Sequence, residues 1–382
     1  MALKIARRGQ VPPFIAMDVL RAANEQAAAG DHVLHLEVGQ PSTPAPVAVL
    51  AAAREALARQ TLGYTDALGL PALREAIAGH YRKSYGVALD PSRVVVTTGS
   101  SGAFLLAFLA AFEPGDRVAL AAPAYPAYRN ILTALDLVPV ELAAGPEHRY
   151  QATIDLLRAQ GQGVDGLIVA SPANPTGTML APEELAAIVR YCRDRGIRLI
   201  SDEIYHGIVY SVTATTALSS GDEAFVVNSF SKYFSMTGWR LGWMVAPLDM
   251  LRPIECLAQN LFISPPALSQ HAALAAFGCQ DELDANVARY ARNRALLLDE
   301  LPKAGFSRFA PADGAFYLYA DVAHLTNDSP EFCRRMLREI GVACTPGTDF
   351  DRQRGNATVR LSFAGATDTM AEAARRLKAW RR

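Results

Sequence analysis

Short apolar runs alternate with helical patterns through the middle of the chain. Continuous runs of branched and small apolar residues, bounded by turn signals, predict buried strands. These runs cover residues 93–97, 118–121, 138–142, 166–170, 198–201, 224–227 and 241–246. Between them, apolar residues recur at helical spacing at 103–112, 128–135, 154–159 and 182–195. This alternation predicts an α/β fold, with a mainly parallel sheet covered by helices on both faces.

The pattern differs toward both ends of the chain. An irregular arm and a short helix precede a strand-like alternation at 33–38, and helical periodicity returns at 46–60 and from Pro71. Later segments place helices and strands in another order, at 253–262, 266–277, 283–303, 315–322, 331–340, 358–363 and 369–381. We expect residues 1–45 to form an N-terminal arm and part of a small domain, 46–282 a large domain, and 283–382 a small α+β domain.

The composition is that of a globular protein of ordinary charge. The 382 residues exceed one small core and predict two domains of usual size. A net charge of -1, without basic or acidic blocks, gives no support to nucleic-acid or membrane-surface binding. Neither a signal-peptide pattern nor a bilayer-length apolar run occurs, so we expect a cytoplasmic protein. The five cysteines are scattered, which predicts reduced thiols and no metal site.

A lysine follows the predicted strand at 224–227. The stretch Ser229-Phe230-Ser231-Lys232 places it at the mouth of a buried strand, beside hydroxyl and aromatic side chains. An amine that is partly desolvated has a lowered pKa and can act as a nucleophile. Arg240 follows in the same stretch as a fixed cation. A reactive amine, hydroxyls and an arginine together suit an aldehyde that carries a phosphate.

Polar residues follow other predicted strands as well. In an open α/β sheet, ligands bind beyond the carboxyl ends of the strands. Ser100 and Ser101 open a helix after the strand at 93–97, and their backbone N–H groups suit an anion. Asn174 lies on a proline-rich turn after 166–170, and Asp202 follows 198–201. Each residue alone is typical of a turn or a helix cap, but their recurrence predicts one site at one edge of the sheet.

These motifs resemble a known family, the class I/II aminotransferases of pyridoxal-phosphate fold type I, near their bacterial aspartate aminotransferase branch. They are Asn174-Pro175-Thr176-Gly177, Asp202-Glu203-Ile204-Tyr205 and Ser229-Phe230-Ser231-Lys232 through Arg240. The likeness extends from Gly39-Gln40-Pro41 to Arg360-Leu361-Ser362-Phe363. It implies a large cofactor-binding domain with a smaller α+β domain, pyridoxal 5'-phosphate as cofactor, and a homodimer with shared active sites.

The resemblance also implies roles for individual residues. Lys232 would bind the cofactor's aldehyde covalently and then act as general base and acid. Asp202 would keep the pyridine nitrogen protonated, while Tyr205 and Asn174 would hydrogen-bond the phenolic oxygen. Tyr125, in Ala124-Tyr125-Pro126, would stack on the ring. The residues implied to bind the phosphate are Ser100, Ser101, Ser229, Arg240 and, from the neighbouring subunit, Tyr64.

The substrate's α-carboxylate needs a fixed partner with two parallel donors, which is the geometry of an arginine. Arg360 lies in a predicted strand, where it shares a face with Thr358 and Ser362. The resemblance implies that Arg360 binds this carboxylate and that the backbone N–H of Gly39 adds a second contact. Tyr125 and Asn174 complete the implied substrate-binding set.

The sequence also bears on the substrate's side chain. Relatives that prefer dicarboxylates carry a basic residue just after the first residues of the phosphate loop, where this chain has Gly102-Ala103-Phe104. Phe14, Ile15 and Met17 are candidate pocket walls. We therefore predict ping-pong transamination of a neutral, apolar or aromatic L-amino acid, with pyruvate or 2-oxoglutarate as acceptor.

Several alternatives remain open at this point. Arg21 or Arg129 could supply a cation, which would make the protein an aspartate aminotransferase. The same residues would also serve a lyase that eliminates the side chain of a sulfur amino acid, because the cofactor carries the chemistry. A ligand sensor of the transcription-regulator type needs an N-terminal DNA-binding domain, and the segment before Gly39 is shorter than the ~50 residues of a domain. Asp351 stands where relatives usually have a glycine, and the sequence assigns it no role.

Overall fold

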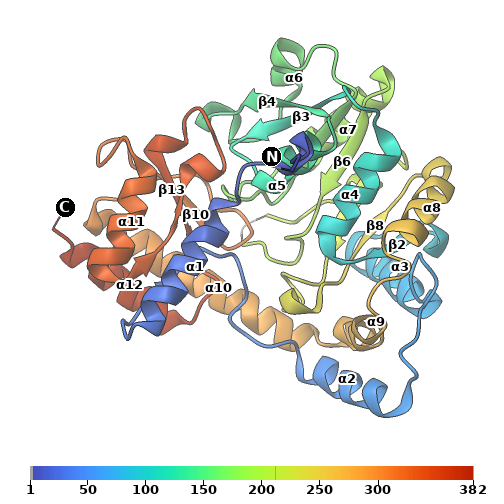
Figure 1. The fold of residues 1–382 in the computed structure, drawn as a ribbon, viewed down its shortest axis with the longest axis horizontal. Coiled ribbons are helices and arrows are strands. Elements are labelled where there is room, and N and C mark those ends of the chain that lie inside the picture. Colours follow the sequence, from blue (N-terminus) through green and yellow to red (C-terminus); the bar gives the residue numbers. More distant parts are fainter. Residues whose placement is uncertain (1–2, 211, 382) are drawn as a thin grey trace.

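The larger of the two main sheets is formed by the middle part of the sequence. The computed structural model describes residues 3–210 and 212–381 (Figure 1). In the described part, a seven-stranded sheet has the order β2-β8-β7-β6-β5-β3-β4. Its strands are β2 (Val94–Thr97), β3 (Arg117–Ala122), β4 (Val138–Ala143), β5 (Gly166–Ala170), β6 (Arg198–Asp202), β7 (Phe225–Ser229) and β8 (Gly242–Val245). β8 runs antiparallel to both neighbours and the other pairs are parallel, which confirms the mainly parallel sheet.

Helices cover this sheet because its strands are apolar on both faces. Val226 and Trp243 pack into one buried cluster, whereas Val227 and Met244 pack into another on the opposite face. The first face is covered by α2 (Val47–Arg59), α3 (Pro71–Tyr85), α6 (Ile154–Gln160), α7 (Pro182–Arg195) and α9 (Ala267–Ala273). The second is covered by α4 (Gly99–Ala111), α5 (Pro126–Ala134) and α8 (Leu251–Leu261).

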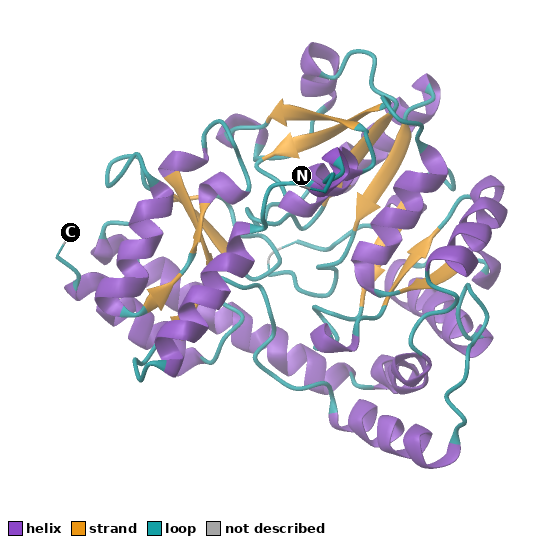
Figure 2. Cartoon of the chain, in the orientation of Figure 1, coloured by secondary structure: helices purple, strands orange, loops and turns teal. Residues whose placement is uncertain are grey.

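A second, antiparallel sheet belongs to the C-terminal part of the chain, and Figure 2 shows its strands apart from the larger sheet. Its order is β12-β13-β10-β9. These strands are β9 (Arg308–Phe309), β10 (Tyr317–Asp321), β12 (Thr345–Pro346) and β13 (Thr358–Ser362). The helices of this part are α10 (Gln280–Glu300), α11 (Ser329–Ile340) and α12 (Thr367–Ala379). The two sheets have separate hydrophobic cores, which agrees with the expected division into two units. The domain boundaries expected at residues 46 and 282 stay a prediction.

The N-terminal segment packs on this C-terminal part. β1 (Leu34–His35) pairs in parallel with β11 (Val342–Ala343), and α1 (Ile15–Ala28) lies along the C-terminal part in Figure 1. Val19 and Ala23 of α1 pack against Leu337 and Ala343. Segments far apart in sequence therefore build the smaller unit.

Several element bounds differ from the sequence-based expectation. The strand predicted at 33–38 shortens to β1 because Val38 and the residues after it line a cavity. α4 begins at Gly99, so the small residues expected in a turn form its first helical turn. The long helix predicted at 283–303 ends at Glu300, since Pro302 cannot continue the hydrogen-bond ladder. The helix predicted at 266–277 passes from α9 into a 3₁₀ turn.

Candidate active site

A cavity of about 400 Å³ lies beyond the carboxyl ends of the central strands. Side chains from the large sheet, the small sheet and α1 all line it. Most of the residues expected in the site meet there, namely Gly39, Ser100, Ser101, Tyr125, Asn174, Asp202, Tyr205, Lys232, Arg240 and Arg360. Ser229 and Tyr64 are the expected residues that do not line it.

Lys232 is the amine of this cavity. Its Nζ donates a hydrogen bond to the carbonyl oxygen of Gly39 at 2.7 Å. Burial lowers the pKa of Lys232 to about 8, and the positive charges of Arg360 and Arg240 act in the same direction. The carboxylate of Asp202 opposes this shift. The structure thus shows the desolvated, readily deprotonated amine that the sequence led us to expect.

Asp202 provides a buried carboxyl group on the cavity wall. It ends β6, and its Oδ1 accepts a hydrogen bond from the backbone N–H of Ile204 at 3.0 Å. The hydroxyl of Tyr128 donates to Oδ2. Burial raises the pKa of Asp202 to about 6, and both hydrogen bonds and the charge of Lys232 limit that rise. These donors help Asp202 remain an anion near neutral pH.

The first turn of α4 and Arg240 form a cradle for an anion. Gly99 opens α4 with a φ of +71°, and Ser100 and Ser101 follow it into the cavity. A Cβ at Gly99 would lie 2.5 Å from Nη2 of Arg240, so the guanidinium lies directly against the helix start. Backbone N–H groups, the helix dipole and a guanidinium are the donors that a phosphate binds.

Two residues expected at the phosphate lie elsewhere in this structure. The hydroxyl of Ser229 is buried and donates to the carbonyl oxygen of Leu241 at 3.1 Å. Ser231, two residues on, lines the cavity in its place together with Thr237. Tyr64 is 83% exposed in a loop after α2. A role for Tyr64 in a neighbouring subunit stays a prediction.

Arg360 is a fully enclosed guanidinium at one end of the cavity. It lies between the rings of Tyr317 and Phe350, at 4.4 and 4.6 Å from their centroids. Nη1 donates to Oδ1 of Asn174 at 2.8 Å, and Nη2 donates to the carbonyl oxygen of Glu37. Among the described residues, Nε of Arg360 has no hydrogen-bond partner. A buried arginine with a donor to spare is suited to bind a carboxylate.

Tyr317 was not anticipated from the sequence. Its hydroxyl lies 2.7 Å from the hydroxyl of Tyr205, and both side chains line the cavity. A Cβ at Gly39 would fall 1.6 Å from the same hydroxyl, which explains why a glycine is needed at that position. Tyr317 lies on β10, where its apolar neighbours gave no signal distinct from a core strand. Tyr128, which contacts Asp202, lies in the helix expected at 128–135 and was likewise not anticipated as a site residue.

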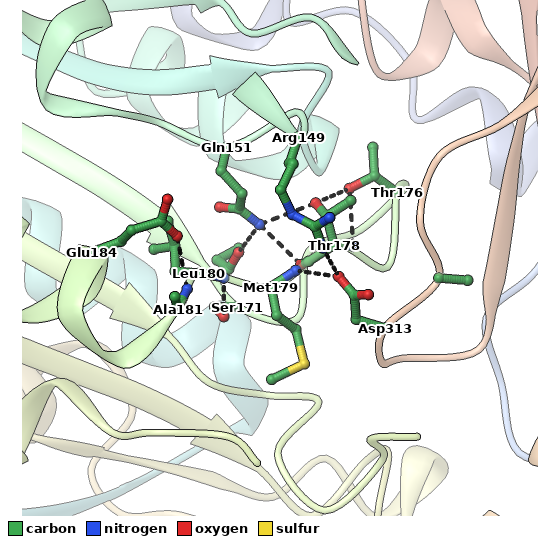
Figure 3. A network of polar contacts seen from close by, with 12 residues as sticks. Arg149, Gln151, Ser171, Thr176, Thr178, Met179, Leu180, Ala181, Glu184 and Asp313 are labelled. Atoms are coloured by element: carbon green, nitrogen blue, oxygen red, sulfur yellow. Dashed lines mark hydrogen bonds and ion pairs between the residues drawn. The ribbon is translucent and has the colours of Figure 1, made fainter. Parts of the chain in front are cut away.

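The turn that carries Asn174 is fixed by a polar network (Figure 3). Nε2 of Gln151 donates to the carbonyl oxygen of Thr178 at 2.9 Å, and Asp313 accepts from the backbone N–H of Met179 at 3.2 Å. The other labelled members of the network are Arg149, Ser171, Thr176, Leu180, Ala181 and Glu184. Because these bonds come from both units, they hold the Asn174 turn between the two sheets.

One wall of the cavity is apolar and comes from α1 and the residue before it. The side chains concerned are Phe14, Ala16, Met17 and Leu20. Neither arginine considered as an extra cation reaches the cavity. Arg21 is solvent-exposed and pairs with Asp18 at 3.0 Å. Arg129 is buried but donates to backbone carbonyl oxygens, including that of Phe350 at 3.2 Å. Of the described residues, the cations that line the cavity are Lys232, Arg240 and Arg360.

The chain is similar in sequence to a known protein family. Residues 31–377 match the family "Aminotransferase class I and II". The chain belongs to the class I and II aminotransferases. This confirms the family, the fold and the enzyme class expected from the sequence.

Relatives of this aminotransferase are similar over almost the whole chain. A valine–pyruvate aminotransferase of Mycobacterium tuberculosis is 52% identical, covering 100% of this chain and 99% of that protein. An aminotransferase crystal structure from the same organism has a TM-score of 0.98 at 51% identity and covers 99% of both chains. Aspartate aminotransferase from Thermus thermophilus with maleate has a TM-score of 0.93 at 31% identity, covering 99% of this chain and 100% of that chain.

Two other classes of site do not occur in the part of this aminotransferase that the structure describes. No group of three or more histidine, cysteine and acidic side chains is arranged to hold a metal ion there. No described helix has both the length and the apolar character needed to cross a membrane.

Proposed function

We propose that this aminotransferase uses pyridoxal 5'-phosphate to move the amino group of a neutral, apolar L-amino acid to a 2-oxo acid, with pyruvate as the preferred acceptor. The apolar wall formed by α1 carries the proposal. Each cation that lines the cavity among the described residues would bind another group. Lys232 would bind the cofactor's aldehyde, Arg240 its phosphate, and Arg360 the substrate's α-carboxylate. Among the described residues of this chain no further cation lines the cavity, so a side-chain carboxylate at the wall would be left unpaired.

The residues present fit the proposed cofactor. Lys232 supplies an amine for its aldehyde, and the start of α4 with Arg240 supplies donors for its phosphate. The space that glycine leaves at residue 99 brings this guanidinium against the helix N-terminus. Asp202 supplies a buried carboxylate for a protonated ring nitrogen. The aldehyde, the phosphate and the ring nitrogen of the cofactor would thus each contact a suitable group.

The chain's own residues would each perform one task in the transfer. When bound, pyridoxal phosphate supplies the electron sink for negative charge that develops at the substrate's Cα. Arg360 binds the α-carboxylate and so orients the Cα–H bond. Lys232 accepts the Cα proton, because its lowered pKa leaves part of the amine uncharged near neutral pH. The second half-reaction runs the same steps backward on the 2-oxo acid.

The relative from Mycobacterium tuberculosis supports the choice of substrates, because its name specifies valine and pyruvate. A half-reaction screen tests the proposal. Purified holoenzyme would be mixed with single amino acids, and the visible absorbance of the bound cofactor would be followed. We expect valine, leucine and alanine to react at least about tenfold faster in kcat/KM than aspartate or glutamate.

Three outcomes would count against the proposal. Dominance of aspartate or glutamate would make the protein an aspartate aminotransferase. Release of ammonia from a sulfur amino acid without any 2-oxo acid would indicate a lyase. Covalent attachment of the cofactor to the chain in Lys232→Ala would show that another lysine binds the cofactor. Tyr125→Phe is a matched control, since it removes a cavity hydroxyl but leaves the amine in place.

We also propose a homodimer in which Tyr64 reaches the phosphate of the other subunit. Its support is the exposure of a large aromatic side chain in a loop beside Ser264, whose Oγ accepts from the N–H of Thr65 at 3.3 Å. Sedimentation analysis should give a mass of two chains. Tyr64→Phe should weaken cofactor binding while the dimer persists. A monomer with full activity would contradict this part of the proposal.

A further inference from the structure

The helix that forms the apolar wall is capped from a distant part of the chain. Phe14 occupies the N-cap position of α1 and offers no side-chain acceptor to the first turn. The carboxylate of Asp349 does so instead. Its two oxygens accept from the backbone N–H groups of Ile15 and Ala16, at 3.1 Å each. An acidic group at this position also interacts favourably with the helix dipole.

Asp349 is itself held against the large unit. Its backbone carbonyl oxygen accepts from Nη2 of Arg129, and the next carbonyl, of Phe350, accepts from Nη1 at 3.2 Å. The N–H of Ala124 donates to the same Phe350 oxygen at 3.1 Å. Arg129 is on α5, which begins directly after Tyr125. Asp349, which caps α1, is therefore hydrogen-bonded to α5, the helix that begins directly after the cavity residue Tyr125.

The wall and this tyrosine are also in direct contact. The ring of Phe14 meets the ring of Tyr125 edge-on, with centroids 5.7 Å apart and planes at 82°. Both rings line the cavity, as does Ala16 in the capped turn. A shift of the first turn of α1 would move Phe14 away from Tyr125 and change the shape of the side-chain pocket.

We propose that Asp349 is a positioning residue that sets the enzyme's selectivity among apolar side chains, by capping α1 and holding Phe14 against Tyr125. This inference rests on the proposed function, because it concerns the pocket for the substrate's side chain. Asp349 touches neither substrate nor cofactor in this scheme. It acts through the position of α1, so its loss would affect which side chain fits more than the chemistry itself.

The charge and both oxygens of Asp349 matter to this role. The side chain is 1% exposed, and burial raises the pKa of Asp349 while the two N–H donors oppose the rise. Asn at this position keeps the size and one acceptor oxygen but turns an amide N–H₂ toward the second donor. Ala removes both acceptors. Asp349→Ala should therefore change the selectivity more than Asp349→Asn does.

The matched control removes another helix cap of the same C-terminal unit. Oδ1 of Asp328 accepts from the N–H of Glu331 at the start of α11. α11 contributes no residue to the cavity lining, and it packs against α1 at Leu337, near the opposite end of α11 from the turn that Asp328 caps. Asp328→Ala should destabilise the protein in the same way as Asp349→Ala without reaching the pocket. It separates a loss of stability from a change of selectivity.

The experiment compares kcat/KM for alanine, valine, leucine and phenylalanine in holoenzyme of the wild type, Asp349→Asn, Asp349→Ala and Asp328→Ala. We expect the ratio between the best branched substrate and alanine to fall about tenfold in Asp349→Ala, mainly through KM, and less in Asp349→Asn. Asp328→Ala should keep the wild-type ratio. Amide hydrogen exchange at residues 15–20 should speed up in the Asp349 variants only.

Three results would overturn the inference. An unchanged ratio in both Asp349 variants, with faster exchange in α1, would show that the cap is purely structural. The same loss of selectivity in Asp328→Ala would show a general effect of destabilisation. A wild type that prefers aspartate would overturn the proposed function and this inference with it, whereas the first two results leave the proposed function intact. Asp349→Asn keeps the test usable if Asp349→Ala fails to fold.

Discussion

Arg360 is held by carbonyl and amide oxygens and by two aromatic rings. Among the described residues, no acidic side chain forms an ion pair with it. A buried cation without an acidic partner is costly, so a substrate carboxylate would supply the missing charge. This explains how binding of the α-carboxylate can contribute strongly to affinity at a buried guanidinium.

Arg360→Lys is predicted to raise KM for amino acids by roughly 10- to 100-fold, because lysine keeps the charge but loses the planar pair of donors. Steady-state kinetics with valine over a wide concentration range would measure this. Arg308→Lys, at an exposed ion pair with Asp321, is the control and should leave KM unchanged. An unaltered KM in Arg360→Lys would mean that the carboxylate binds elsewhere.

Glu203 lies directly after Asp202 and is buried without lining the cavity. Its Oε1 accepts hydrogen bonds from Ser201, Thr216 and the N–H of Ala217. Burial raises the pKa of Glu203 from 4.5 to about 8. Between these values the folded protein binds more protons at this group than the unfolded chain does. The free energy of unfolding should therefore fall as pH rises through this window.

We predict that Glu203→Gln removes this fall, which amounts to ~1.4 kcal/mol per pH unit at most. Urea unfolding at pH about 6.5 and about 8 would measure it. His206 and His80, whose pKa values burial lowers from 6.5 to about 4, add the same slope in the wild type and in Glu203→Gln, so their contribution cancels in the difference between the two proteins. The exposed Glu75→Gln is the control and should retain the wild-type slope. An unchanged slope in Glu203→Gln would contradict the assignment.

At the scale of elements, the start of α4 combines a left-handed glycine with a close arginine. Any side chain at residue 99 would meet the φ of +71° and the guanidinium of Arg240 together. A residue with a Cβ in this conformation costs ~1–2 kcal/mol before any clash is counted. The helix start and Arg240 can thus share one anion only because residue 99 is a glycine.

Gly99→Ala is predicted to weaken binding of pyridoxal phosphate by roughly tenfold or more. Spectrophotometric titration of the apoenzyme with pyridoxal phosphate would determine the affinity. Gly79→Ala in α3, where a Cβ meets no atom within 4 Å, is the control. It should leave the affinity unchanged and stabilise the protein by about 0.5–1 kcal/mol. Equal affinities in Gly99→Ala and wild type would contradict the phosphate site.

At the scale of the whole molecule, the C-terminal unit is fastened to the large one near residue 351. Asp351, for which the sequence suggested no role, accepts from Nε of Arg354 at 2.7 Å and from its backbone N–H at 2.9 Å. Nη2 of Arg354 then donates to the carbonyl oxygens of Ala122, at the end of β3, and Ala144. The carboxylate thus orients an arginine that bridges the two units.

Arg354→Ala is predicted to lower the free energy of unfolding by ~1–3 kcal/mol, because it leaves the buried Asp351 without its charged partner. Chemical denaturation would measure the change. Arg338→Ala on α11 removes exposed ion pairs and should cost less than about 0.5 kcal/mol. Equal stability of both variants would show that Arg354 does not fasten the units.

Local sequence patterns were sufficient for much of the fold and the site. The apolar runs predicted the strands of the large sheet, because strands buried on both faces must be apolar throughout. Lys232, Asp202 and Asn174 could be placed at one edge, since the carboxyl ends of parallel strands face the same way. The family motifs then assigned roles to these residues, which the order and spacing of the residues alone do not provide.

Only the tertiary structure decided which distant residues meet. Tyr317 beside Gly39, Tyr128 on Asp202 and Asp349 at the start of α1 join segments that no local period connects. Ser231 rather than Ser229 lines the cavity, because the hydroxyl of Ser229 is buried and donates to the carbonyl oxygen of Leu241. Period and propensity act over a few neighbouring residues, whereas these contacts depend on how two units pack together. The sequence therefore determined the chemistry, and the packing determined the pocket in which it acts.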